Sequence, residues 1–435
     1  FGIMKIYLWN QWCWFCWGLV LYSNGIWGQQ FDLRQWACSD GVSRPYVVYT
    51  PAGTSKTARP LVVFLHGGIG ASGVKKDPVE YARKSPWVAL ADEGNFCLLF
   101  PFGEQKASWF DHVGTQMLLG EIEQLKWNGV ADPERVFLTG FSDGGSGVFY
   151  LAMTTPDPFA GFIPMNGSIK VASMLGKEGI YPENMNGKPM YIINTQEDIL
   201  YPLEQMEAAA NYLKAYNAQV TFRPLAGGHD MSYFPMEKPA LLSFINTHQH
   251  TFLTEISLES SSQGKTSIGW LTLKKIDTSA TKAQWHTSYK YKIQNNKADF
   301  GLKYDYSYRG VGVRVAGFKS DTATAKRMGV QVGDVLIQME QDSISSPYSP
   351  LYYTARKRAG DSTSLTLMRE EHPLILYGKF NAGYPYYLLN NKKPSGKIQG
   401  RIEGKYLYLK ASCVADYQID KRKLPRKIKK VILEK

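Results

Sequence analysis

The chain has 435 residues, of which 44% are hydrophobic and 13% aromatic. This composition supplies enough apolar side chains for folded cores and excludes a chain that is disordered throughout. The length allows two or three domains. The net charge is +12, and cations are densest in residues 421–435. No aromatic residues are interleaved with them, so we interpret this tail as a charged edge strand or solubilising tail and expect no nucleic-acid binding. Attraction to acidic glycans or other anionic polymers is the alternative.

Residues 1–28 have the pattern of a secretory signal peptide. Met4 and Lys5 form a short basic start, an apolar run occupies residues 12–22, and small residues follow between positions 23 and 28. The apolar run is too short for a comfortable membrane span, so we expect no stable span. We expect a protein that is secreted or resides in the periplasm or cell envelope. An uncleaved N-terminal anchor is the alternative.

Three cysteines remain beyond this segment: Cys38, Cys97 and Cys413. An odd number forbids complete pairing within one chain. Cys97 lies in an apolar run that is typical of a buried strand. A disulfide between Cys38 and Cys97 is therefore an alternative that we do not favour.

Apolar strand patterns alternate with helix-like segments in the first part of the chain. Strands are predicted within residues 45–53, 60–68 and 95–103, and helices around 78–93 and 115–128. This alternation predicts an α/β fold with a doubly wound sheet.

The segment RVFLTGFSDGGSG, residues 135–147, is the most informative motif. An apolar strand runs directly into Ser142, which Gly140 and Gly144 flank in a G-x-S-x-G pattern. The glycines remove side chains that would collide where the strand and the next helix approach each other. The serine hydroxyl can then be presented to a histidine base, which it needs because it is a poor nucleophile near neutral pH.

Upstream, the apolar run Leu61–Leu65 is followed by His66, Gly67 and Gly68. Small residues at this point let backbone N–H groups face a developing negative charge on the substrate oxygen. We therefore predict an oxyanion-stabilising loop here.

An acid and a histidine follow two later strand patterns. Asp198 ends the apolar segment 189–198, and His229 follows Gly227 and Gly228 after a strand that begins at residue 220. Ser142, Asp198 and His229 thus each lie past the C-terminal end of a predicted strand, where open parallel sheets place their sites. Glu197 is the alternative acid.

Residues 30–250 resemble the secreted esterase branch of the α/β-hydrolase superfamily. That branch includes feruloyl and acetylxylan esterases, polyhydroxybutyrate depolymerases and dienelactone-hydrolase-like proteins, which share the S-x-G-G elbow. The resemblance implies an acyl-enzyme mechanism on an ester substrate without a cofactor. The implied roles are Ser142 as nucleophile, His229 as base, Asp198 as orienting acid, and the N–H groups of Asp143 and of Gly68 or Ile69 as oxyanion donors.

The residue after the nucleophile, Asp143, departs from the smaller or uncharged residue that is common there. We expect its N–H to serve the oxyanion site and its carboxylate to contact substrate or disfavour anionic ligands near the entrance. The sequence shows no zinc-type spacing and no Walker or dinucleotide glycine pattern after a strand. We therefore expect no metal and no organic cofactor.

The segment 107–114 follows a predicted strand and carries Trp109 and Phe110. We predict that these two rings line the acyl or sugar pocket. An aromatic pair that faces the core is the equal alternative.

Beyond residue 250 the sequence becomes rich in strand and turn patterns. We divide the chain into a catalytic domain at 29–250, a β-rich linker module at 251–299, a further domain at 300–372 and a β-rich basic segment at 373–435. The two β-rich segments are expected to join into one module.

Residues 300–372 resemble PDZ domains of bacterial exported proteins, through YRGVGVRVAGF and through the later Gly-Asp strand pattern. The resemblance implies capture of a peptide C-terminus by N–H groups on a strand edge, with added positive charge. A groove filled by the protein's own chain is the alternative. The residues assigned to peptide binding are Arg309, Val311, Gly312 and Val313.

Together these features predict a secreted serine hydrolase that cleaves carboxylic esters, including carbohydrate esters. Two alternatives remain: a serine peptidase of the same superfamily, and a non-enzymatic envelope binding protein on a hydrolase scaffold. The chain shows no propeller domain and no acidic pair for a peptide amino terminus, which disfavours the peptidase. The intact Ser, His and acid set disfavours the binding protein.

Overall fold

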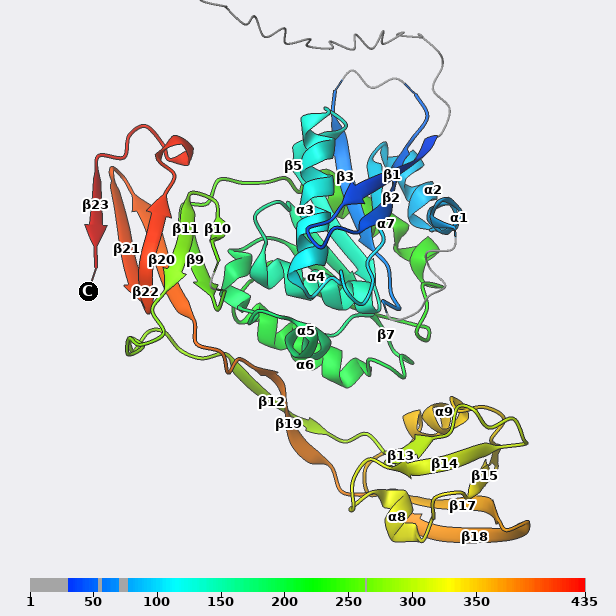
Figure 1. The fold of residues 1–435 in the computed structure, drawn as a ribbon. Coiled ribbons are helices and arrows are strands. Elements are labelled where there is room, and N and C mark those ends of the chain that lie inside the picture. The colour runs from blue at the N-terminus through cyan, green and yellow to red at the C-terminus, as the bar shows by residue number, and fades with distance from the viewer. Residues whose placement is uncertain (1–29, 54–56, 70–76, 263, 435) are drawn as a thin grey trace, which may run out of the picture.

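The computed structural model describes residues 30–53, 57–69, 77–262 and 264–434. The expected signal peptide lies outside these residues. Figure 1 shows an α/β domain, a β module beside it, and a smaller distal unit that hangs from a two-stranded stem.

The α/β domain is built on an eight-stranded sheet with the order β1-β2-β4-β3-β5-β6-β7-β8. The pairs β1–β2 and β2–β4 are antiparallel, and all pairs from β4 to β8 are parallel. The central strands are buried on both faces, which explains their continuous apolar runs. The strands are β1 (Gln30–Ala37), β2 (Ser43–Thr50), β3 (Arg59–Leu65), β4 (Cys97–Pro101), β5 (Ala131–Phe141), β6 (Gly161–Met165), β7 (Met190–Thr195) and β8 (Val220–Leu225).

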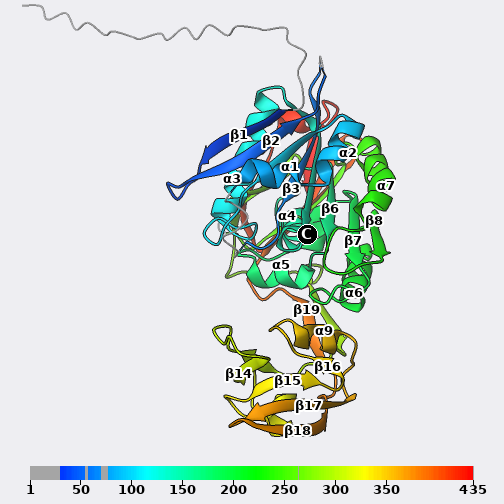
Figure 2. The same ribbon diagram turned by 90° about the vertical axis from the view of Figure 1, so that its right-hand side faces the viewer.

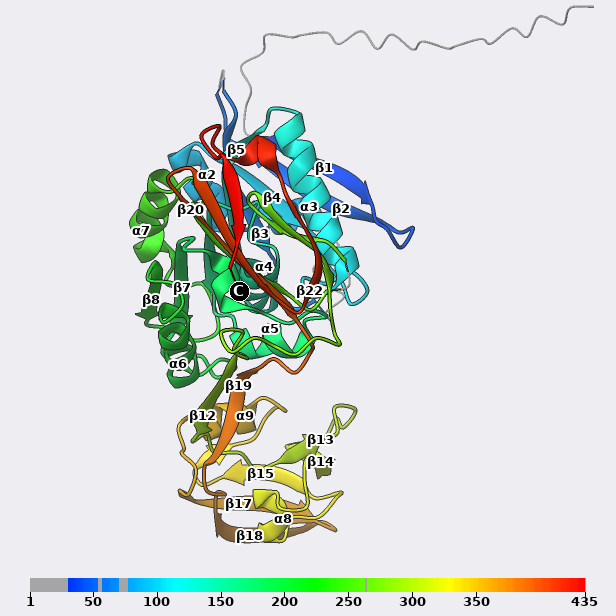
Figure 3. The same ribbon diagram turned by 90° about the vertical axis from the view of Figure 1, so that its left-hand side faces the viewer.

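Helices cover both faces of this sheet (Figures 2 and 3). Four pack on one face and three on the other, and each group closes its own apolar core. The first group is α3 (His112–Trp127), α4 (Asp143–Thr154), α5 (Ile169–Leu175) and α6 (Leu203–Lys214), and the second is α1 (Pro78–Arg83), α2 (Trp87–Gly94) and α7 (Phe234–Thr247). The single helix expected over 78–93 is two helices, since Pro86 lacks the N–H that a continuing helix needs.

The β module joins the two segments that flank the distal unit. Its four-stranded sheet has the order β23-β21-β20-β9, and its three-stranded sheet has the order β10-β11-β22. Strand β23 forms an edge in the basic tail. The strands are β9 (Glu255–Ser260), β10 (Thr266–Ile268), β11 (Leu271–Ile276), β20 (Gly396–Glu403), β21 (Tyr406–Ser412), β22 (Val414–Ile419) and β23 (Lys430–Leu433).

The stem is the antiparallel pair β12 (Lys290–Asn295) and β19 (Tyr384–Asn390). The distal unit, residues 298–380, has its own apolar core and a sheet with the order β13-β14-β15-β17-β18. Because β18 belongs to this sheet, the unit extends beyond the expected boundary at residue 372. Its elements are β13 (Leu302–Tyr304), β14 (Val313–Phe318), α8 (Thr324–Met328), β15 (Val335–Met339), β16 (Asp342–Ser343), α9 (Ser349–Ala355), β17 (Ser362–Arg369) and β18 (His372–Lys379).

Cys38, Cys97 and Cys413 are buried and free, so the alternative Cys38–Cys97 disulfide does not form in the structure. Cys97 lies in the buried strand β4, where a small apolar side chain packs well. No helix in the described part of the chain is long and apolar enough to cross a membrane.

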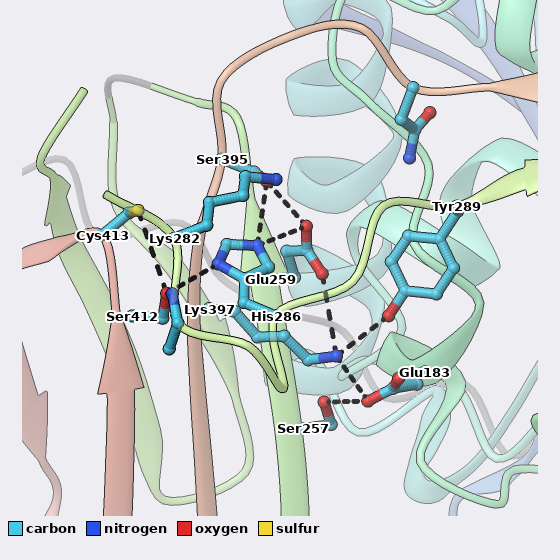
Figure 4. Close-up of polar contacts among 12 residues, drawn as sticks. Glu183, Ser257, Glu259, Lys282, His286, Tyr289, Ser395, Lys397, Ser412 and Cys413 are labelled. Carbon is cyan, nitrogen blue, oxygen red and sulfur yellow. Dashed lines mark hydrogen bonds and ion pairs between the residues drawn. The ribbon is translucent and has the colours of Figure 1, made fainter. Parts of the chain in front are cut away.

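A buried polar cluster fastens the β module to the α/β domain (Figure 4). Lys397 on β20 is 1% exposed, and its Nζ lies 2.9 Å from Glu183 Oε2 and 3.9 Å from Glu259 Oε2. Glu183 belongs to the short helix η1 (Pro182–Met185) of the α/β domain, whereas Glu259 lies on β9. The same Nζ donates to the hydroxyl of Tyr289 at 3.2 Å. One buried cation therefore neutralises acids from both bodies.

We predict that Lys397→Met lowers the free energy of unfolding by about 3–5 kcal/mol, because it leaves two carboxylates without their buried cation. Urea denaturation of the full chain measures this loss. Lys392→Met is the matched control, since Lys392 is exposed in the same module, and it should change stability by less than about 0.5 kcal/mol.

The pH dependence provides a second readout. Burial acts to raise the pKa of Glu183, but the hydrogen bond and charge of Lys397 outweigh it, so this pKa lies below its usual value. The stability from this contact is therefore fully present above about pH 4.3 and is lost as the pH falls through the lower folded-state pKa. A difference between wild type and Lys397→Met that grows on acidification would contradict this assignment.

Candidate active site

Ser142 occupies a strained turn between β5 and α4. Its φ of 60° and ψ of −119° lie outside the regions that most residues adopt. A side chain at Gly144 would place its Cβ 1.9 Å from the carbonyl oxygen of Leu65, so only glycine fits where the helix crosses β3. This geometry is that of a nucleophile elbow, which lifts the serine above the carboxyl end of the sheet.

The structure brings Ser142, His229 and Asp198 together from three different strand ends. His229 Nε2 lies 2.9 Å from Ser142 Oγ, and His229 Nδ1 lies 2.9 Å from Asp198 Oδ2. An ionised carboxylate can only accept, so Nδ1 carries the proton and donates to Asp198. Nε2 is then the acceptor for the Ser142 hydroxyl.

Asp198 is 3% exposed and accepts four hydrogen bonds. Oδ2 accepts from His229 and from Asn166 Nδ2 at 2.8 Å, and Oδ1 accepts from the backbone N–H groups of Leu200 and Tyr201 at 2.9 Å each. Burial acts to raise the pKa of this carboxyl group. The hydrogen bonds from His229, Asn166 and the Tyr201 N–H outweigh burial and hold the pKa below its usual value. Asp198 is therefore ionised at neutral pH.

The imidazole of His229 is held between two aromatic rings. The Phe141 ring centroid lies 4.9 Å from that of His229, and the Tyr201 ring meets it edge-on at 5.5 Å. Glu197, the alternative acid, is exposed, and the His229 Nδ1 position is already taken by Asp198. The geometry thus favours Asp198 as the partner of the histidine.

The predicted oxyanion loop lies against the elbow. A Cβ at Gly67 would fall 2.9 Å from Ser142 Cβ, and Gly68 adopts a φ of 62°. The N–H of Ile69 donates to Asp143 Oδ2 at 3.1 Å. This corrects two expectations: the Ile69 N–H is already engaged, and the Asp143 carboxylate ties the loop to the first turn of α4.

Trp109 and Phe110 are not pocket residues. They are 0% and 3% exposed and belong to the apolar core, so the predicted contact with substrate is wrong and the core-facing alternative holds. Trp109 Nε1 donates to the carbonyl oxygen of His66 at 3.0 Å. The ring therefore supports the oxyanion loop from the side of the apolar core.

The peptide-binding assignment in the distal unit needs correction at Arg309, Gly312 and Val313, whereas Val311 is 85% exposed. Val313 is 2% exposed and lies on β14, which has β13 on one side and β15 on the other. An interior strand has no free edge for an added peptide. Arg309 donates to the carbonyl oxygens of Tyr306 and Tyr308, and a Cβ at Gly312 would meet the backbone of β15. The sheet edges are β13 and β18 instead.

Sequence reasoning missed the residues that hold the acid. Asn166 directly follows β6, is fully buried, and donates to Thr195 Oγ1 at 2.7 Å as well as to Asp198. A polar residue at the end of a buried strand was the available signal. Tyr201 follows Asp198 by three residues, and nothing in its local pattern distinguished it from a turn residue.

The described residues contain no group of three or more His, Cys, Asp or Glu side chains that could hold a metal ion. The chemistry that this geometry allows is nucleophilic attack by Ser142 with His229 as the base.

Comparisons with known proteins found similarity in the first part of the chain. Residues 51–249 match the phospholipase/carboxylesterase family. The bifunctional acetylxylan esterase/xylanase XynS20E of Neocallimastix patriciarum is 26% identical over 182 residues, which are 41% of this chain and 24% of that protein. Carboxylesterase SOBER1 of Arabidopsis thaliana is 25% identical over 202 residues, which are 40% of this chain and 85% of that protein. A solved thermostable esterase has a TM-score of 0.40 at 20% identity and covers 51% of this chain and 63% of its own.

We predict that Asp198→Asn lowers kcat by about 10³–10⁴-fold, because an amide at this position stabilises the wrong imidazole tautomer. Steady-state hydrolysis of a p-nitrophenyl ester measures the loss. Glu197→Gln is the matched control, since it removes the neighbouring exposed carboxylate, and it should keep kcat within about twofold. A crippled Glu197→Gln with an active Asp198→Asn would reverse the assignment of the acid.

Proposed function

We propose that the protein hydrolyses carboxylic esters through an acyl-enzyme on Ser142, and the match of residues 51–249 to the phospholipase/carboxylesterase family supports this proposal. The observation that carries this proposal is the continuous chain of hydrogen bonds from Ser142 through His229 to Asp198. It supplies a nucleophile, a base in the correct tautomer and a charge that stabilises the protonated base.

In the first step, His229 Nε2 takes the hydroxyl proton as Ser142 Oγ attacks the ester carbonyl. The tetrahedral intermediate expels the alcohol, to which the imidazolium returns the proton. Water then attacks the acyl-enzyme with His229 again as base, and the acid product leaves. Asp198 stays ionised throughout and orients the ring.

We assign the oxyanion donors to the N–H groups of Asp143 and Gly68. Asp143 opens the 12-residue helix α4, whose N-terminus favours developing negative charge. The Ile69 N–H is committed to the Asp143 side chain, so Gly68 is the donor that the loop offers. The contact between Ile69 and Asp143 holds the two donors in register.

We propose esters of carbohydrates as the substrate class. Support comes from the similarity to an acetylxylan esterase/xylanase, although this chain covers only 24% of that protein. The serine peptidase alternative makes the opposite prediction, because it requires cleavage of amides. Parallel assays on acylated oligosaccharides and on aminoacyl amides therefore separate the two.

We predict that Ser142→Ala abolishes labelling by a fluorophosphonate probe and lowers ester hydrolysis by at least about 10³-fold. Ser412 provides a stringent control, because it also contacts a histidine that in turn contacts an acid. Its Oγ lies 3.0 Å from His286 Nδ1, and His286 Nε2 lies 3.1 Å from Glu259 Oε1 (Figure 4). This second serine, histidine and acid set is buried, so Ser412→Ala should keep full labelling and turnover. Labelling that persists in Ser142→Ala would refute the nucleophile assignment.

A further inference from the structure

A cavity of about 1020 Å³ lies between the α/β domain and the distal unit and reaches the active site. One wall contains Asp198 and His229, together with the start of α6. The opposite wall is formed by the end of β12 and by α9 with the residues that follow it. In Figure 1, α9 is the part of the distal unit that faces the α/β domain. The volume exceeds the range of about 300–1,000 Å³ that is typical for small ligands.

The distal wall is held in place by specific contacts. Tyr291 on the stem stacks on Tyr212 of α6, with ring centroids 4.5 Å apart. Just beyond the stem, Lys297 Nζ donates to the carbonyl oxygen of Ile199 at 2.8 Å. Ile199 directly follows Asp198, so the distal wall is tied to the loop that carries the acid. These contacts hold the two walls of the cavity in place relative to each other.

Amide side chains make up most of the uncharged polar residues in the lining. An amide offers two donors and one acceptor oxygen, which suits hydroxyl groups that both donate and accept. Both walls contribute to this set: Gln196, Gln205, Gln294, Asn295 and Asn296.

The charges in the lining balance. Four cations come from the distal side and four carboxylates from the α/β domain, so the lining residues carry no excess of one charge. The charged residues are Lys297, Arg356, Lys357, Arg358, Glu197, Asp198, Glu204 and Asp230.

Besides the amides, Tyr352 and Arg358 on the distal side are available to a ligand. Tyr352 on α9 lines the cavity and is 62% exposed, and an aromatic ring can cover the apolar face of a sugar. Arg356 and Lys357 pair with Asp342 and Glu340, whereas Arg358 is exposed and forms no ion pair with the described residues. Arg358 can therefore donate to ligand oxygens.

We infer that this cavity holds the alcohol part of the ester, and that this part is a neutral, hydroxyl-rich molecule such as an oligosaccharide of several rings. The inference rests on the proposed esterase function and deepens it, because the distal unit becomes a wall of the substrate site. The acyl group is bound near Ser142, while the sugar extends past His229 between the walls.

The test uses the full chain and two acetyl esters that differ only in the alcohol: acetylated neutral xylo-oligosaccharides and p-nitrophenyl acetate. The variants are Tyr352→Ala, Arg358→Ala and the double substitution. We expect kcat/KM on the oligosaccharide ester to fall about tenfold for each single variant, which is the loss of one stacking or hydrogen-bonding contact. On p-nitrophenyl acetate, kcat/KM should stay within twofold.

Tyr377→Ala is the control, because Tyr377 is 77% exposed on β18 of the same unit and is absent from the cavity lining. It should leave both reactions unchanged. Equal losses on both esters, or a double variant that keeps wild-type kcat/KM on the oligosaccharide ester, would overturn the inference. Wild-type turnover of p-nitrophenyl acetate alone would also overturn it. Turnover of neither ester by the wild type would instead refute the proposed function on which the inference rests.

Discussion

The structure of the site depends on keeping one buried carboxylate charged. Asp198 is almost fully enclosed, and burial acts to raise its pKa, but the hydrogen bonds from His229, Asn166 and the Tyr201 N–H hold this pKa below the usual value. The donors come from Asn166 after β6, from His229 after β8 and from the backbone of its own loop. The parallel sheet makes this possible, because it gathers these strand ends along one edge. The charge then fixes the imidazole tautomer on which the proposed attack by Ser142 depends.

The loop that carries Asp198 also connects the α/β domain to the distal unit. On one side it holds Asp198, and on the other the Ile199 carbonyl accepts from Lys297 at the entrance to the distal unit. Burial of Lys297 lowers the pKa of its ammonium group, while the negative charges of Asp299 and, to a smaller extent, Asp198 act to raise it. The distal unit is therefore in direct contact with the loop that carries Asp198.

Much of the α/β domain could be predicted from sequence, because buried parallel strands leave continuous apolar runs and the elbow needs glycine at Gly144. The candidate nucleophile, acid and base could be found because each follows such a run. The supporting residues could not be found in this way. Asn166 acts through a contact that is distant in sequence, and Trp109 looks the same in sequence whether its ring faces a ligand or the core. In the distal unit, β13 is only three residues long, so the pattern pointed to β14 and not to the edge strand.

A second serine, histidine and acid set makes similar contacts in this structure, so residue types alone do not identify the nucleophile. Ser412, His286 and Glu259 make contacts of 3.0 and 3.1 Å, nearly as short as those at Ser142. They lie at the interface between the β module and the α/β domain. They are buried from solvent and lie next to the buried ammonium group of Lys397. Ser142 differs in its strained backbone, its partial exposure and the helix N-terminus beside it. A hydrogen-bonded serine becomes a nucleophile only where the backbone also leaves space for a carbonyl and directs N–H groups at its oxygen.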